Sequence, residues 1–433
     1  MVSKQKKLRW MRLDNAAKIY PAARRNNWSN VYRLSFTLKE EVDPDILQKA
    51  LDITVTRFPS IAARLRRGLF WYYLEQLPQA PKLSPERSYP LTHMHRDEIR
   101  RCAFRVIAYK NRIAVEFFHS LTDGTGGLVF LKTLVAEYLE QKHGISIPFT
   151  DGVLDRREAP REEELEDSFL RSAGPVCASR KATDAFDLTG TPEQDGFLHL
   201  TCLKLSVDAV LEKAHEYGVS VTAFLCAAML QAILRLQADT APRTKKPAKV
   251  QIPINLRRLF PSSTLRNFSM YTVPEADPRM GPYSFKELCL LSHHHIGLEA
   301  TAKRMGAIIA TNVHDERSLL VRLIPLFLKN IVMKTIFDMV GEKKSCLSLS
   351  NLGTVQVPKE MEGYISRVDF ILGVQAATPY NCGVVSWNND LYINFIRGVQ
   401  ETGLEYRLFK VLQEQGLAVQ AQSNHSGGIH VLL

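Results

Sequence analysis

One histidine and one aspartate, four residues apart, are the side chains of this sequence best suited to acid–base chemistry. His119 and Asp123 stand in "EFFHSLTDGTGG", residues 116–127, where a strand-forming stretch gives way to a helix-forming one. Along "RIAVEFFH", successive residues fall on opposite faces of a strand, so His119 shares its face with aliphatic and aromatic side chains. Removal from water would keep this imidazole neutral, and a neutral imidazole can accept a proton near pH 7.

The sequence leaves three roles open for Asp123. The residue comes after a short turn and just before loop glycines, which allow tight backbone geometry and leave N–H groups open at a helix start. Its carboxylate could neutralise a positive charge, cap the following helix or orient His119. From spacing alone, a structural histidine followed by a simple turn remains the more common explanation, because H-x-x-x-D is a short pattern with many chance matches. The stretch "DGTGG" also lacks the Lys-Ser/Thr ending of a phosphate-binding loop.

The elements around this pair alternate between strands and helices. Residues 31–38, "VYRLSFTL", are rich in strand formers, and 43–59 has the apolar spacing of a helix that ends at a proline. The stretches "AFRVIAY" and "RIAVEFFH" flank a Lys-Asn pair and predict a hairpin. A helix is expected to follow Gly126 and to end at Gly144.

A charged linker separates this set of elements from a second one. Residues 151–167 are dense in charge and poor in large apolar side chains, and the chain from there to about Asp195 predicts a crossover connection. The second set comprises a strand at 197–205, helices at 208–217 and 220–236, and strands at "KVQIPINL", "SCLSLSN", "GVVSW" and "LYINFI". The sequence therefore predicts two mixed αβ domains, residues 1–165 and 196–433, joined by a linker of residues 166–195.

Composition is typical of a folded protein. The 433 residues are enough for two domains of about 200 residues each. The formal net charge of +11 suits nucleic acid, an anionic membrane or a phosphate-bearing small molecule, and nucleic acid is the weakest of these because the basic residues are dispersed. Seven cysteines without a C-x-x-C pair favour a reducing compartment, so we expect a cytoplasmic protein without a structural zinc site.

The most apolar long segment, residues 318–340, carries Arg322, Lys329 and Lys334 and is interrupted by Pro325. A membrane span needs roughly 20 nearly uncharged residues, so we expect a partly buried helical segment here. An amphipathic helix on a membrane surface is the minor alternative, which leaves membrane contact open.

The stretch "FHSLTDG" resembles the H-x-x-x-D-G signature of the chloramphenicol acetyltransferase-like superfamily, which includes alcohol acyltransferases and the condensation domains of peptide synthetases. Other segments are similar to that superfamily in the expected order along nearly the whole chain. They are "RLDNAAKIYPAA", "VTRFPSIAARLRRGLFWYYLEQ", "PINLRRLFP", "RNFSMY" and "LSLSNLGTVQVP". The closest resemblance is to alcohol acetyltransferase-like and stand-alone condensation-domain proteins. This resemblance favours a catalytic role for His119 over a purely structural one.

This resemblance implies two similar αβ-sandwich domains with an active-site tunnel between them. A thioester donor would enter from one mouth and an acceptor from the other, and His119 would act as general base for direct attack on the acyl carbonyl. A covalent enzyme intermediate is not expected, because no G-x-S-x-G elbow is present for a serine nucleophile.

The resemblance also assigns supporting residues. The motif aspartate would pair with an arginine, for which Arg257 is the candidate and Arg258 the alternative. The oxyanion of the tetrahedral intermediate needs a hydrogen-bond donor. The candidates are the Gly124 N–H and the side chains of Ser348, Ser350 and Asn351. For "SNLG" a strand-ending turn is an equally good explanation.

Coenzyme A carries phosphates, so a basic tunnel mouth would help to bind acyl-CoA as a co-substrate that is not tightly held. The best basic cluster is "PRTKKPAK", with Arg243, Lys245, Lys246 and Lys249, although a solvated basic loop is the more common explanation. No metal site is predicted: His293, His294 and His295 point in different directions on a helix, and His93 with His95 has no further ligand nearby.

The sequence is compatible with three functions. The first is a transferase that moves an acyl group from acyl-CoA to a small alcohol or amine. The second is a condensation-type enzyme that takes its acyl group from an acyl carrier protein, and the third is a scaffold whose tunnel binds a lipid or partner without chemistry. Peptide condensation domains usually carry a second histidine where this chain has Phe118, and no carrier domain is predicted. A free-standing enzyme using soluble acyl-CoA is therefore favoured.

Overall fold

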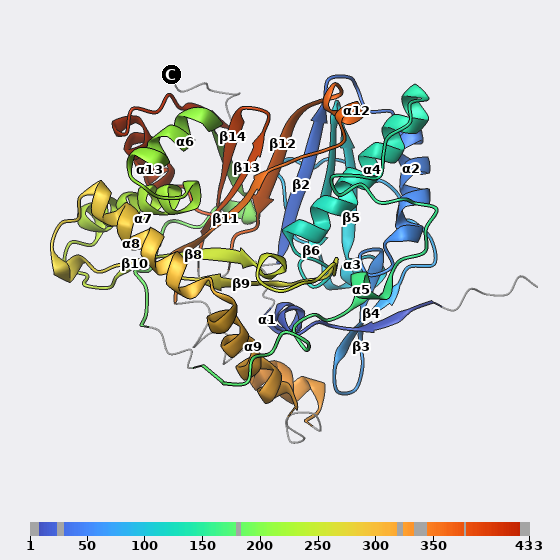
Figure 1. The fold of residues 1–433 in the computed structure, drawn as a ribbon, viewed down its shortest axis with the longest axis horizontal. Coiled ribbons are helices and arrows are strands. Elements are labelled where there is room, and N and C mark those ends of the chain that lie inside the picture. The colour runs from blue at the N-terminus through green and yellow to red at the C-terminus, as the bar shows by residue number, and fades with distance from the viewer. Residues whose placement is uncertain are drawn as a thin grey trace, which may run out of the picture.

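Two large β-sheets lie side by side in the computed structural model, each covered by helices (Figure 1). The structure describes residues 8–23, 30–178, 183–317, 324–332, 344–375 and 378–424. The apolar segment predicted at 318–340 falls largely outside these residues.

The smaller sheet carries the histidine motif. Its four antiparallel strands run in the order β12-β2-β6-β5, and α2 and α4 pack together over it (Figure 1). The bounds are β2 Val31–Leu38, α2 Pro44–Arg57, α3 Arg96–Arg101, β5 Phe104–Tyr109, β6 Arg112–Phe118 and α4 Gly124–His143. The predicted strand, helix and hairpin of this half are confirmed, and α4 ends at Gly144, whose φ of 67° suits glycine.

A small antiparallel sheet of order β1-β4-β3 and several short helices flank this half. Their bounds are β1 Trp10–Arg12, η1 Ala16–Lys18, α1 Ile19–Ala23, β3 Ala63–Arg67, β4 Tyr72–Gln76, α5 Glu162–Leu165 and η2 Gln194–Gly196.

The larger sheet has the order β10-β8-β11-β13-β14-β7-β15, with β9 paired to β8. Its strands are β7 His199–Ser206, β8 Ala248–Asn255, β9 Ser269–Thr272, β10 Glu275–Ala276, β11 Leu347–Thr354, β13 Tyr380–Trp387, β14 Asp390–Arg397 and β15 Gln420–Ser423. Strand β11 runs parallel to both of its neighbours, whereas the other pairs are antiparallel. The predicted strands of this half are confirmed.

Helices cover the outer side of the larger sheet (Figure 1). They are α6 Val207–Glu216, α7 Val221–Thr240, α8 Phe285–Glu299 and α13 Gly403–Glu414. Further elements are η3 Leu256–Arg258, η4 Pro278–Met280, α9 Ala302–Arg317 and α12 Lys359–Glu362. Helix α7 is long and apolar enough to cross a membrane by length and composition alone, but most of it is buried against α8 and α13. Its apolarity is therefore that of a core helix.

Strand β12, Ile365–Leu372, joins the two sheets. It comes from the C-terminal half of the chain but pairs with β2, and it also contacts β13 of the larger sheet. A strand from the predicted C-terminal domain therefore belongs to the sheet of the N-terminal half. The domain boundaries stay a prediction. The two strands approach closely at Gly383, where an added Cβ would overlap the carbonyl oxygen of Phe370.

This close approach predicts that Gly383→Ala destabilises the protein. A methyl group forced against backbone cannot be relieved by a rotamer change, so we expect a loss of about 1–3 kcal/mol or more in the free energy of unfolding. Gly363→Ala, where an added Cβ meets no atom within 4 Å, is the matched control. Denaturant unfolding of both variants tests the junction, and equal stabilities would contradict a tight contact between β12 and β13.

Candidate active site

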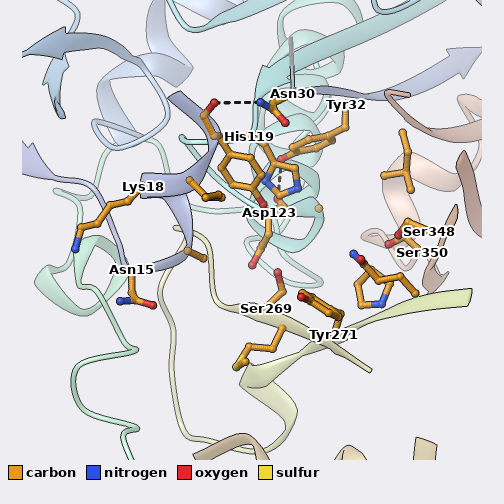
Figure 2. Close-up of a pocket in the computed structure, with 18 of the residues that line it drawn as sticks. Asn15, Lys18, Asn30, Tyr32, His119, Asp123, Ser269, Tyr271, Ser348 and Ser350 are labelled. Atoms are coloured by element: carbon orange, nitrogen blue, oxygen red, sulfur yellow. Dashed lines mark hydrogen bonds between the residues drawn. The ribbon is translucent and has the colours of Figure 1, made fainter. Parts of the chain in front are cut away.

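A cavity of about 940 Å³ lies where the two halves meet, and His119 is in its wall (Figure 2). Its lining includes the segment 15–20, the start of α4, and parts of β2, β8, β9, β11 and β12. The site is thus assembled from parts of the chain that are far apart in sequence.

His119 follows the last residue of β6 and is fixed by contacts on several sides. Its backbone N–H donates to the Asn30 carbonyl at 2.8 Å, and its ring stacks on Tyr20 with centroids 4.5 Å apart and meets the edge of Tyr32 at 5.1 Å. Burial lowers the pKa of His119 below its usual 6.5, while hydrogen bonding to its own backbone and to Asn267, together with the Asp123 charge, acts in the opposite direction. Burial therefore favours the neutral form of the imidazole.

The Asp123 carboxylate is held by three donors. Arg257 Nη1 and the Phe268 backbone N–H each donate to Oδ2 at 2.8 Å, and the Gly126 N–H donates to Oδ1 at 3.1 Å as the N-terminal cap of α4. Of the three roles left open by the sequence, the structure thus shows charge pairing and helix capping. No hydrogen bond joins Asp123 to His119 among the described residues.

Arg257 also donates hydrogen bonds to the turn that precedes Phe268. Its Nε donates to the Thr264 carbonyl at 2.9 Å and its Nη2 to the Arg266 carbonyl at 2.6 Å. Arg258, the alternative partner, is exposed. The pair therefore joins the start of α4 to the connection between β8 and β9.

Sequence reasoning did not assign a role to two residues that connect to the histidine. Asn267 Oδ1 lies 3.1 Å from His119 Nδ1, and Asn267 Nδ2 donates to Asp14 Oδ2 at 3.3 Å. Asp14 is fully buried, and burial raises its pKa to about 6 against the opposing charge of Arg266. The only sequence signal was that "RLDNAAKIYPAA" and "RNFSMY" belong to the stretches that carry the family resemblance.

The predicted oxyanion donors all line the cavity. Figure 2 shows Ser348 and Ser350 across the space from His119. The Asn351 side chain is engaged elsewhere, because its Nδ2 donates to Thr222 and its Oδ1 accepts the Gly353 N–H at 2.8 Å. The "SNLG" stretch lies within β11, whose pairing with β13 is irregular there, and Gly353 has a φ of 75°.

The predicted phosphate-binding cluster does not line the cavity. Lys249 is buried in β8, where its Nζ contacts Glu275 and donates to Thr183, and Lys246 pairs with Asp187 at 2.6 Å. The exposed remainder is Arg243 and Lys245.

Two other lysines belong to the cavity wall. Lys18 and Lys329 both approach the Trp71 ring, with their Nζ atoms 5.3 Å and 3.5 Å from its centroid. Burial and the neighbouring Lys18 charge lower the pKa of Lys329. The cavity thus has a basic, aromatic corner that the sequence did not predict.

The histidine pairs noted in the sequence lie apart from the cavity. His93 and His95 meet edge to face at 5.0 Å, and the run from His293 lies on α8. Within the described residues, no group of three His, Cys, Asp or Glu side chains could hold a metal ion.

Comparison with known proteins identifies the fold. No family model matches the sequence, and no curated protein matches it by sequence. The chain superimposes on the trichothecene 15-O-acetyltransferase TRI3 of Fusarium sporotrichioides with a TM-score of 0.61 at 9% identity, covering 96% of this chain and 98% of that one.

Two further structures extend the comparison. TRI101 of F. graminearum, complexed with coenzyme A and T-2 mycotoxin, has a TM-score of 0.63 at 10% identity, covering 95% and 99% of the two chains. Polyketide synthase associated protein 5 of Mycobacterium tuberculosis has a TM-score of 0.56 at 14% identity, covering 94% and 98%. The shared fold confirms the mixed αβ fold class implied by the resemblance to chloramphenicol acetyltransferase-like proteins.

The buried pair of Asp123 and Arg257 predicts a strong effect of substitution. Arg257→Met leaves a carboxylate without its charged partner in a buried turn, so we expect the free energy of unfolding to fall by about 3–5 kcal/mol. Arg235→Met removes the half-exposed pair with Glu414 on α13 and should change the free energy of unfolding by less than about 1 kcal/mol. Urea unfolding of both variants measures the difference, and a small effect of Arg257→Met would show that the pair does not hold the turn.

Proposed function

We propose that this protein is an acyltransferase that moves an acyl group from acyl-CoA to the hydroxyl or amine of a small acceptor. The observation that carries the proposal is a buried histidine in the wall of a large cavity between two halves whose fold is shared with acetyltransferases. The coenzyme A in the TRI101 complex supports the choice of donor.

In the proposed reaction, His119 takes the proton of the acceptor while the acceptor oxygen or nitrogen attacks the thioester carbonyl. The carbonyl π electrons move to oxygen and give a tetrahedral oxyanion, for which Gly124 N–H and the hydroxyls of Ser348 and Ser350 are the candidate donors. The oxyanion then re-forms the carbonyl, the C–S bond breaks, and the imidazolium returns its proton to the coenzyme A thiolate. The products are the ester or amide and free coenzyme A.

Asp123 has a supporting part in this proposal. Its carboxylate is paired with Arg257 at 2.8 Å and caps α4, which carries the Gly124 N–H at its first residue. Loss of Asp123 is therefore expected to disturb the backbone around the base and the proposed oxyanion donor together.

The phosphates of the donor require positive charge near the cavity. Lys18 and Lys329 supply it within the cavity wall, whereas the exposed Arg243 and Lys245 lie outside the lining. We therefore place the donor phosphates beside the lysine pair in this proposal, and the loop at 242–249 becomes the alternative.

The first experiment is thiol release by the full chain from acetyl-CoA and longer acyl-CoAs, with a panel of alcohols and amines and product identification by mass. His119→Ala should lower the turnover number by roughly 10²–10⁴-fold, the usual contribution of a general base. His293→Ala, which removes an exposed histidine of α8, should leave turnover unchanged.

Two results would overturn the proposal. A folded His119→Ala protein with full turnover would remove the base. Absence of transfer by the wild type from every soluble thioester would exclude the soluble donor on that panel, and the same acceptors would then be tested with an acyl group on a carrier protein.

The lowered pKa of His119 gives a pH prediction. The base form is needed, so kcat/KM should fall as the pH falls through the pKa of His119, with a midpoint below 6.5. The groups that face the ring are Tyr20, Tyr32, Asn267 and Asp123, and Asp14 titrates in a similar range. The profile is therefore recorded for wild type and for Asp14→Asn, and a wild-type midpoint clearly above 6.5 would contradict a buried, neutral base.

A further inference from the structure

A chain of polar side chains leads from His119 away from the cavity into the core. Asn267 bridges the ring and Asp14, and Arg266 lies 3.7 Å from the Asp14 carboxylate. Asp14 is fully buried, and Asn267 is 2% exposed. The proposed reaction uses neither residue, yet burying a carboxylate is unfavourable unless its bonds compensate for the lost hydration.

The hydrogen bonds that link Asp14, Asn267 and His119 have a defined donor-to-acceptor direction. A carboxylate only accepts hydrogen bonds, and Asp14 accepts the Ala17 N–H at 2.7 Å through Oδ1 and the Asn267 amide through Oδ2. An asparagine side chain has one donating end and one accepting end. Because Asp14 binds the donating end, the accepting Oδ1 is the end that faces His119 Nδ1.

The direction of these hydrogen bonds decides which nitrogen of the imidazole carries the proton. An oxygen that only accepts requires a proton on the nitrogen it faces, so Nδ1 carries the proton of the neutral ring. The other nitrogen, Nε2, then has its lone pair. We propose that Asp14 and Asn267 are positioning residues that set the His119 tautomer, with Nδ1 protonated and Nε2 left as the atom that accepts a proton in the cavity.

The His119 carbonyl also accepts a bond from the ring and favours the same protonated Nδ1, but the other side chains around the ring cannot set the tautomer. Asp123 has its two carboxylate oxygens engaged by Arg257, Phe268 and Gly126. Tyr20 stacks on the ring face and Tyr32 meets it with an edge, which fixes the ring plane but does not distinguish the nitrogens. Asn267 is therefore the side chain whose polarity selects one ring nitrogen.

The proposal explains why the N-terminal segment belongs to the site. Asp14 also accepts the Ala17 N–H in η1, and the helix that follows, α1, carries Tyr20, which stacks on His119. One buried carboxylate thus anchors both the segment that stacks on the ring and the amide that bonds to it.

The test reads the tautomer directly and does not depend on activity. The full chain is labelled with ¹⁵N-histidine, the His119 ring is assigned by loss of its signals in His119→Gln, and long-range ¹H–¹⁵N spectra are recorded at pH 8. We expect wild-type His119 to have a protonated Nδ1 and an unprotonated Nε2. Asn267→Leu, which removes the acceptor, should shift the population toward the Nε2-protonated form.

Three further variants sharpen the test. Asn267→Asp keeps an oxygen acceptor and should retain the Nδ1-protonated form. Asp14→Asn releases the direction of the Asn267 amide and should give a mixture of tautomers, and it replaces Asn267→Leu if that variant does not fold. Asn394→Leu removes an equally buried amide in β14, bonded to Asp369 and outside the cavity lining, and should leave His119 unchanged.

Activity provides a second measurement, which rests on the proposed transfer. Asn267→Leu should lower kcat by at least about 10-fold, and by no more than the roughly 10²–10⁴-fold expected for loss of the general base itself, with little change in the KM for acyl-CoA. Asn267→Asp should move the acidic limb of the pH profile to higher pH, because a carboxylate stabilises the imidazolium.

The outcomes separate the two proposals. A wild-type ring protonated on Nε2, or a tautomer that is unchanged in both Asn267→Leu and Asp14→Asn, overturns the positioning role whatever the activity. If the tautomer responds as expected but no thioester is consumed by the wild type, the positioning role stands and the proposed transfer fails.

Discussion

The contact between Asp123 and Arg257 holds together the part of the structure on which everything else at the site depends. It joins the first turn of α4, above the smaller sheet, to the connection that follows β8 of the larger one. The Thr122 hydroxyl adds a bond to the Leu265 carbonyl at 2.6 Å beside it. Because the cavity wall is formed from both sides of this contact, its shape is set by how firmly the two sides are tied.

The contact between Asp123 and Arg257 also brings His119 to its amide partner, Asn267. His119 comes from the end of β6, whereas Asn267 comes from the turn that Arg257 and the Asp123 carboxylate organise through the neighbouring Phe268 N–H. A small displacement of the two halves would therefore lengthen the bond between ring and amide. Close packing at Gly383 and the sharing of β12 between the halves oppose that displacement.

Two buried carboxylates near the histidine have different environments. Asp123 has a guanidinium at 2.8 Å and two backbone N–H donors, so its charge is well compensated. Asp14 has its arginine at 3.7 Å, and its pKa is raised to about 6. The first is suited to hold the fold, and the second is suited to polarise a neutral amide, since its charge is less completely neutralised by a cation.

The amino-acid sequence alone determined the elements and the identity of the motif. Alternation in "RIAVEFFH", the glycines after Asp123 and the glycine at position 144 are local signals, and local sterics and hydrogen bonding decide strands, turns and helix ends. The pairing of Asp123 with Arg257 could also be anticipated, but only through family resemblance, because nothing local links residues 134 positions apart.

Only the tertiary structure decided the partners of His119 and the charge at the cavity. Asp14 and Asn267 are 253 residues apart, and no periodicity or spacing connects them. Lys249 stood in the cluster predicted to bind phosphate but lies buried with Glu275, whereas Lys18 and Lys329 meet at Trp71 from distant parts of the sequence. Hydrogen bonding and desolvation act through space, so the protonation of the histidine and the position of its basic neighbours depend on packing that the sequence encodes only through the complete fold.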